Sequence, residues 1–235
     1  MQRRQLCAQS LALTLTVLCT RHAQALGLSD LGGLSNADAS KGLKAALEQG
    51  AVAAVGLLGT QDGFLGNDKV KIPLPGFLED AAKLMRTFGQ GQRVDELVTA
   101  MNRGAEAAVP IAKDQLTKAI QTMTVTDAKT ILTGGATAVT EFFQTRTRAP
   151  LSIKFLPMVT KATEKAGLAA KFNEVAGKAA EMGLLKKEDS NIQKYVTAKT
   201  LDGLYFMIGE EEKKIRQNPA AYGSTILTKV FGALK

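Results

Sequence analysis

Apolar residues recur at helical spacing along nearly the whole chain, and this feature constrains the fold more than any other. Leu43, Leu47, Gly50, Ala54 and Leu57 follow one another at steps of three and four, which places them on one face of a helix. No run of alternating Val, Ile or Thr is long enough to build a sheet. The pattern therefore predicts an all-α fold, a multi-helix bundle of about eight to ten helices.

Turn residues and prolines predict where these helices end. Asp62-Gly63, Gly66-Asn67 and Pro73-Leu74-Pro75-Gly76 predict one long irregular loop near residues 60–76, in which residues 70–72 could run extended. Thr124 and Asp127 have the spacing of a capping box, which predicts the start of a short helix. Pro157 lies inside one expected helix and is a candidate break. The longer helices are expected at 36–58, 77–88, 94–108, 137–148, 151–166, 168–182, 191–217 and 221–232.

The first 25 residues have the pattern of a secretory signal peptide. Arg3 and Arg4 form a basic start, an apolar stretch follows, and Ala23-Gln24-Ala25 is a small-x-small cleavage site. We therefore expect residues 1–25 to be a signal peptide cleaved after Ala25, and residues 26–235 to form a single helical domain in the periplasm or outside the cell. The pattern leaves open whether the general secretory or the twin-arginine route is used.

Removal of this segment excludes several kinds of chemistry. Cys7, Cys19 and His22 all lie within it and the chain has no Trp, so the mature protein lacks Cys, His and Trp. Disulfides, Cys/His zinc sites, catalytic thiols and His-based triads are then excluded. The chain also has no P-loop and no dinucleotide-binding glycine pattern. We expect no cofactor and no metal, and Asp/Glu chemistry is the main catalytic option left. The longest later apolar run, 51–59, is too short to span a membrane.

Positive charge is concentrated in the second half of the chain. Without the signal peptide 27 bases face 22 acids, and residues 113–235 alone hold 19 bases against 12 acids. One interpretation is a solvated lysine surface. The other is a surface for an anionic envelope lipid or polymer. Nucleic acid is not expected, because the most basic stretch, residues 142–187, has no Trp or Tyr interleaved for base stacking. The candidates for an anionic-surface site are Arg146, Arg148, Lys154, Lys161, Lys165, Lys171 and Lys178.

A second set of polar residues falls beside apolar helix faces. Asn102, Arg103 and Glu106 are close neighbours on one expected helix, whereas Glu211 completes an apolar stripe on another. A carboxylate in such a stripe must be paired or protonated, because burial of an isolated charge is costly. We expect Arg103 and Glu211 to face a shared interior, with Arg216 as a second cation. The alternatives are a Glu that leans out to solvent and a ligand-binding or catalytic acid.

Several segments together resemble a known bacterial family. They are Leu34-Ser35-Asn36-Ala37-Asp38-Ala39, Gln61-Asp62-Gly63-Phe64, Lys71-Ile72-Pro73-Leu74-Pro75-Gly76, and residues 101–110, 127–135 and 210–219. In this order they resemble the Domain of Unknown Function 4197 family. The resemblance covers nearly all of the mature chain and implies an exported, mostly helical bacterial protein. It implies no activity.

Two functional interpretations remain. The first is a periplasmic, non-enzymatic binding or structural module of the cell envelope, whose partner is an envelope protein, an anionic lipid or a polymer. The alternative is an Asp/Glu-dependent hydrolase that acts on envelope polymers. A hydrolase requires two carboxylates that converge on an open cleft, about 5–10 Å apart for glycosides, whereas a binding module can have all its carboxylates paired.

Overall fold

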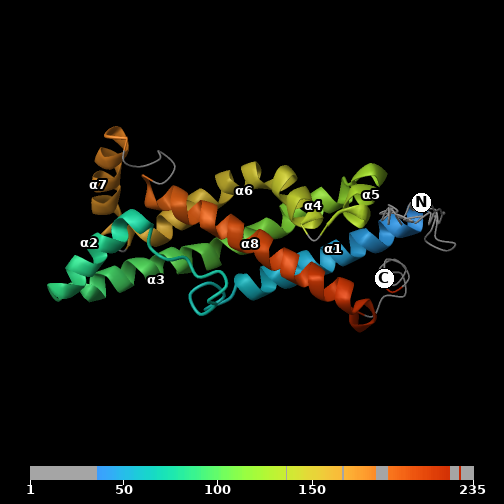
Figure 1. Ribbon diagram of the computed structural model, residues 1–235, viewed down its shortest axis with the longest axis horizontal. Helices are drawn as coiled ribbons and strands as arrows, with labels where there is room; N and C mark the ends of the chain where they lie inside the picture. The colour runs from blue at the N-terminus through green and yellow to red at the C-terminus, as the bar shows by residue number, and fades with distance from the viewer. Residues whose placement is uncertain (1–35, 136, 166, 184–189, 223–227, 229–235) are drawn as a thin grey trace, which may run out of the picture.

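Helices make up all the regular structure in the part of the chain that is described. The computed structural model describes residues 36–222 and residue 228, except for residues 136, 166 and 184–189 (Figure 1). The α-helices are α1 (Asn36–Leu58), α2 (Gly76–Thr87), α3 (Gly91–Ala108), α4 (Ala112–Gln121), α5 (Val125–Thr133), α6 (Ala138–Glu164), α7 (Ala169–Glu181) and α8 (Ile192–Gln217). Two 3-10 turns, η2 (Val109–Ile111) and η3 (Pro219–Tyr222), complete the set. The all-α class is confirmed, and most of the helix expected at 221–232 lies outside the described residues.

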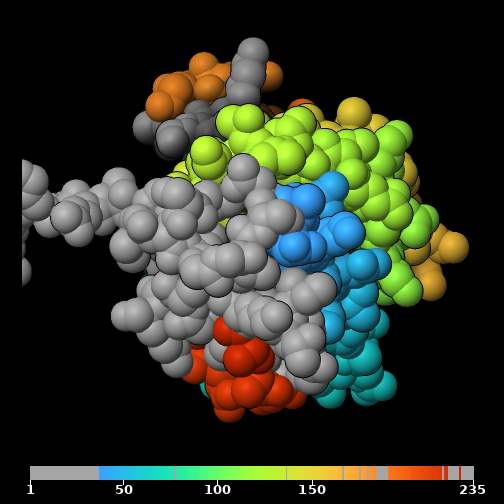
Figure 2. Space-filling model, turned by 90° about the vertical axis from the view of Figure 1, so that its right-hand side faces the viewer, coloured from blue at the N-terminus to red at the C-terminus, as the bar shows by residue number. Residues whose placement is uncertain are grey.

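The bundle is elongated and is built around α6 and α8 (Figure 1). α6 packs on α8 and α3, while α1 packs on α8 and α4. Gly50 of α1 is buried and lies next to Glu211 and Ile215 of α8. The small side chains of α1 thus let the two helices approach closely. Figure 2 looks onto the end of the molecule where α1 begins and shows α4 and α5 beside it.

Prolines interrupt the helices at one place but not at another. Pro110 lies in η2, between α3 and α4, as a residue without an N–H predicts. Pro150 and Pro157, however, both lie inside the continuous helix α6. The predicted separation of 137–148 from 151–166 is therefore wrong. Each proline removes one hydrogen bond, but the helix is held in place by the fully buried side chains of Leu151, Phe155 and Val159.

The segment between α1 and α2 is irregular, as predicted, and no strand forms at Val70–Ile72. It packs into the bundle, where the side chain of Phe64 is completely buried. A Cβ atom added to Gly203 of α8 would lie only 2.9 Å from Cε1 of Phe64 and 3.3 Å from Cβ of Val70. The loop therefore lies directly on the backbone of α8, and only glycine leaves room for it there.

This contact predicts the effect of a single methyl group. Gly203→Ala should lower the free energy of unfolding by about 1–3 kcal/mol, because the methyl group overlaps the Phe64 ring. Gly56→Ala is the matched control, since a Cβ at this exposed position of α1 meets nothing within 4 Å. The control should leave stability unchanged or raise it by up to about 1 kcal/mol. Urea unfolding of both variants tests this, and equal stabilities would contradict the packing of the loop on α8.

Candidate functional site

Asn102 of α3 binds both backbone groups of one loop residue. Its Oδ1 accepts a hydrogen bond from the N–H of Ile72 at 2.8 Å, and its Nδ2 donates to the carbonyl of Ile72 at 2.9 Å. Nδ2 also donates to the carbonyl of Val98 on the same helix. Asn102 is completely buried. The side-chain amide thus gives Ile72 the two hydrogen bonds that a neighbouring strand would give it in a sheet. These bonds hold the loop against α3.

Glu106, one turn further along α3, binds the other end of the loop. Its Oε1 accepts hydrogen bonds from the N–H groups of Phe64 and Leu65, both at 3.1 Å. Its Oε2 accepts a hydrogen bond from Nη1 of Arg103 at 2.6 Å, while Nη2 of Arg103 donates to Asp62 at 2.8 Å. The hydrogen bond to Glu106 raises the pKa of Arg103, which keeps the guanidinium charged. We call Asn102, Arg103 and Glu106 the α3 clamp.

The expected pair between Arg103 and Glu211 does not form. Glu211 is buried, but Nζ of Lys214 donates to its Oε1 at 2.6 Å, one turn along the same helix. The carboxylate of Glu211 is thus paired with Lys214, and the guanidinium of Arg103 is paired with Glu106 and Asp62. The pairs Arg103–Glu106 and Lys214–Glu211 each have the i,i+3 spacing of one helix, whereas Asp62 belongs to the irregular loop, so spacing gave no sign of it.

Glu212 is a buried acid that the helical pattern equally allowed but that we did not single out. Its exposed fraction is 6%. Nε of Arg216 donates to its Oε1 at 2.6 Å, and Nη2 of Arg216 also donates to the carbonyl of Ile131 on α5. Within the described residues the Oε2 atom has no hydrogen-bond partner. Arg216 therefore accompanies Glu212 rather than Arg103 and Glu211.

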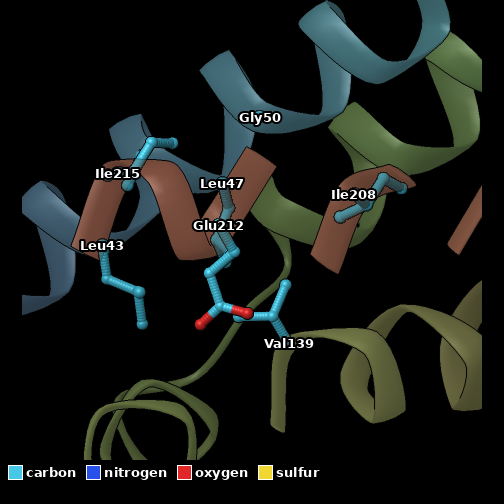
Figure 3. A pocket seen from close by; sticks show the side chains of 8 residues that line it. Leu43, Leu47, Gly50, Val139, Ile208, Glu212 and Ile215 are labelled. Carbon is cyan, nitrogen blue, oxygen red and sulfur yellow. The ribbon is translucent and has the colours of Figure 1, made fainter. Parts of the chain in front are cut away.

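Glu212 lines a small apolar cavity between α1, α6 and α8 (Figure 3). The cavity measures about 10 Å³ and is lined by Leu43, Leu47, Val139 and Ile208, among others. This is about the space that one water molecule needs. Burial raises the pKa of Glu212, although Arg216 and Lys213 act in the opposite direction. The lining residues from α1 and α6 carry no charge that could compensate this burial.

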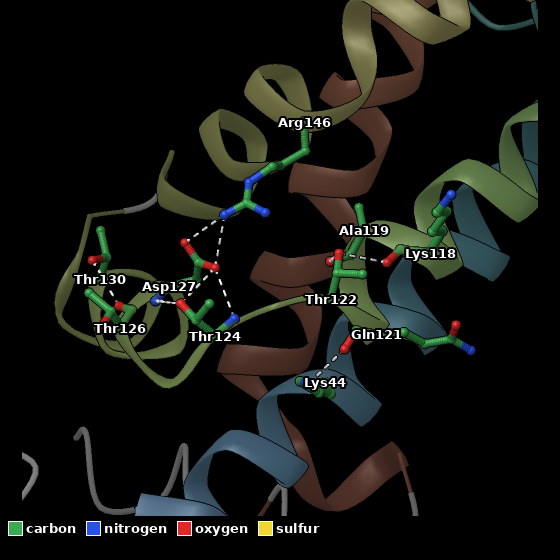
Figure 4. Close-up of polar contacts among 10 residues, drawn as sticks. All are labelled: Lys44, Lys118, Ala119, Gln121, Thr122, Thr124, Thr126, Asp127, Thr130 and Arg146. Carbon is green, nitrogen blue, oxygen red and sulfur yellow. Dashed lines mark hydrogen bonds and ion pairs between the residues drawn. The ribbon is translucent and has the colours of Figure 1, made fainter.

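A larger cleft of about 500 Å³ lies between α5 and α6 and contains two carboxylates, Asp127 and Glu141. The predicted capping box is present: Thr124 and Asp127 exchange hydrogen bonds at the start of α5 (Figure 4). Asp127 also pairs with Arg146 of α6 at 3.0 Å. The pKa of Asp127 is lowered by the N–H of Thr124 first, and by its hydroxyl and Arg146 as well. Asp127 therefore stays ionised and joins two helices.

The seven basic candidates fall into two groups. Three are paired: Arg146 with Asp127, Arg148 with Asp202, and Lys178 with Glu174. The other four are exposed and have no carboxylate partner among the described residues: Lys154, Lys161, Lys165 and Lys171. Lys154 and Lys161 lie on α6 and Lys165 caps its C-terminal end, and their steps of seven and four place all three on one side of the helix. We call these three the α6 lysine row.

Two general features also bear on function. Among the described residues, no three acidic, histidine or cysteine side chains come close enough to share a metal ion. Over the same residues, no helix combines the length and the apolar character that crossing a membrane requires.

The geometry thus defines an all-helical protein in which side chains of one helix hold a long irregular loop at its buried residues Phe64 and Ile72. Over residues 33–232 the sequence matches the family described as Protein of unknown function (DUF4197). This match spans nearly the whole chain and confirms the resemblance, and the protein belongs to this family. No curated protein and no solved structure matches the sequence.

The α3 clamp predicts a large effect for one carboxylate. Glu106→Ala should lower the free energy of unfolding by about 2–4 kcal/mol, because it leaves two loop N–H groups without an acceptor. Glu174→Ala removes an exposed carboxylate from an ion pair on α7 and should leave stability essentially unchanged. Urea unfolding measures both. A loss below about 1 kcal/mol for Glu106→Ala would mean that water replaces its hydrogen bonds to the loop.

The raised pKa of Glu212 predicts how stability depends on pH. The folded protein keeps a proton on Glu212 at pH values where the unfolded chain, with its ordinary value of 4.5, has released it. The contribution of Glu212 to the free energy of unfolding should therefore fall as pH rises above about 4.5, by at most about 1.4 kcal/mol per pH unit. Glu212→Gln should remove this contribution. Urea unfolding between pH 4 and about 8 tests this, and parallel profiles for the wild type and the variant would contradict it.

Proposed function

We propose that the protein is an exported, non-enzymatic binding module of the cell envelope and that it recognises an anionic envelope surface. The observation that carries this proposal is the α6 lysine row. Lys154, Lys161 and Lys165 are exposed on one helix face and have no carboxylate partner among the described residues. Charges that are not neutralised within the protein are available to an anionic partner.

The location in the envelope is supported by the signal peptide pattern of residues 1–25, which would bring the mature chain to the periplasm. Membranes and polymers there carry many anionic groups. Attraction between them and the α6 lysine row would need no deep pocket, because electrostatic attraction acts over a Debye length of about 10 Å at 0.1 M salt.

The alternative, a hydrolase, has less support from the site geometry. A glycosidase pairs a general acid of raised pKa with a second carboxylate across an open cleft. In the cleft between α5 and α6, the pKa of Asp127 is lowered, and Asp127 is bound by Thr124 and Arg146. The other carboxylate of this cleft, Glu141, accepts a hydrogen bond from the hydroxyl of Thr137. These contacts suit a helix junction better than acid catalysis.

Co-sedimentation of residues 26–235 with anionic vesicles tests the proposal. Binding at low salt should weaken strongly at 1 M salt, where the Debye length shrinks to about 3 Å. Replacement of Lys154, Lys161 and Lys165 by Gln should weaken low-salt binding at least about tenfold. The matched control replaces three other exposed lysines, Lys41, Lys113 and Lys129, by Gln and so removes the same charge elsewhere.

The control variant should retain most of the binding. No binding at low salt, binding that is indifferent to salt, or an equal loss in both triple variants would contradict recognition by the α6 lysine row.

A further inference from the structure

A second basic site lies away from the α6 lysine row, in a groove between residues 69–73 of the loop and α8. The groove has a volume of about 400 Å³, within the usual range of small-molecule sites. Its lining combines three lysines with apolar residues, of which Pro73 and Phe206 are exposed and Val70 is buried. The lysines are Lys69, Lys71 and Lys199. None of these lysines is among the basic candidates that the sequence suggested.

The charges in the groove are not balanced. Nζ of Lys69 is bound to Glu210 at 3.2 Å, and the carboxylate of Asp202 is bound to Arg148 at 2.8 Å. Lys71 and Lys199, in contrast, have no carboxylate partner among the described residues. Lys199 lies over the ring of Tyr195, with Nζ 5.8 Å from the ring centre, an uncharged neighbour for a cation. Two uncompensated cations thus face one groove.

An apolar surface adjoins these cations. Phe206 is 43% exposed, although it lies on the otherwise well-packed helix α8. Gly203, one turn earlier on α8, lines the same groove. A simple inorganic anion would use the lysines but not this surface. A ligand that carries an anionic group and an apolar chain would use both.

The wall of the groove is held in place before any ligand arrives. Asn102 binds the N–H and the carbonyl of Ile72 from the side of α3. The hydroxyl of Tyr195 donates to the carbonyl of Pro73 at 3.2 Å. A wall fixed in this way loses little conformational entropy on binding, which favours affinity.

We propose that this groove binds an anionic amphiphile. Lys71 and Lys199 contact the phosphate or carboxylate group, and Phe206, Val70 and Pro73 contact the apolar chain. The site is separate from the α6 lysine row, so this proposal stands or falls independently of vesicle binding.

Isothermal titration calorimetry of residues 26–235 with dodecyl phosphate, below its micelle concentration, tests the proposal. Dodecyl phosphate should bind, whereas inorganic phosphate and the uncharged dodecyl maltoside should bind at least about tenfold more weakly. The double variant Lys71→Gln/Lys199→Gln should weaken dodecyl phosphate binding at least about tenfold. Lys71→Arg/Lys199→Arg keeps both charges and should retain most of the affinity.

The matched control is Lys154→Gln/Lys161→Gln, which removes two charges from the α6 lysine row and should leave dodecyl phosphate binding unchanged. All substituted lysines are exposed, and circular dichroism verifies that the variants fold. No binding to the wild type, or equal affinity for the Gln variant, would overturn the proposal. Inorganic phosphate binding as tightly as dodecyl phosphate would refute the role of the apolar surface, and equal binding of the maltoside would refute that of the lysines.

Discussion

Buried backbone amides need hydrogen-bond acceptors, and in this protein α3 supplies them to a segment that has no regular structure of its own. The loop after α1 enters the bundle at Phe64 and leaves it beyond Ile72. Glu106 accepts a hydrogen bond from the N–H of Phe64, and Asn102 accepts one from the N–H of Ile72. Loss of these two side chains would leave buried backbone groups of the loop without partners and would weaken the groove wall formed by residues 69–73.

Two buried carboxylates of α8 also need partners, and cations on the same helix provide them. Glu211 and Glu212 are adjacent and both buried, yet each has a cation on the same helix, Lys214 three residues later and Arg216 four residues later. The flexible stems of Lys and Arg let their charged ends reach outward while the carboxylates stay inside. α8 therefore brings its own counterions to the core. As a result, no charged side chain is needed from α1 here, and the residues of α1 that face this part of α8 are small or apolar.

The sequence predicted well those features that depend on neighbouring residues. The bounds of α1 and the capping box of α5 agree with the prediction, because periodicity and capping are local signals. Features that depend on packing were missed. Pro157 does not break α6, since buried side chains on both sides of it stabilise the helix. Glu106, three residues from Arg103 on α3, was noted as its neighbour, but its second partner, Asp62, could not be foreseen, because that contact depends on the path of an irregular loop over α3.

The two attachment points of the loop have a consequence for how this chain can vary. Surface loops of this length usually accept inserted residues with little effect. Here Glu106 and Asn102, one turn of α3 apart, bind Leu65 and Ile72, so the backbone is fixed at both ends of this stretch. A residue added within the largely exposed turn 66–69 can leave both attachment points in place, whereas one added next to Phe64 or Ile72 would displace that residue from its partner on α3. The tolerance of insertions should therefore differ within this one irregular segment, high in the turn 66–69 and low beside Phe64 and Ile72.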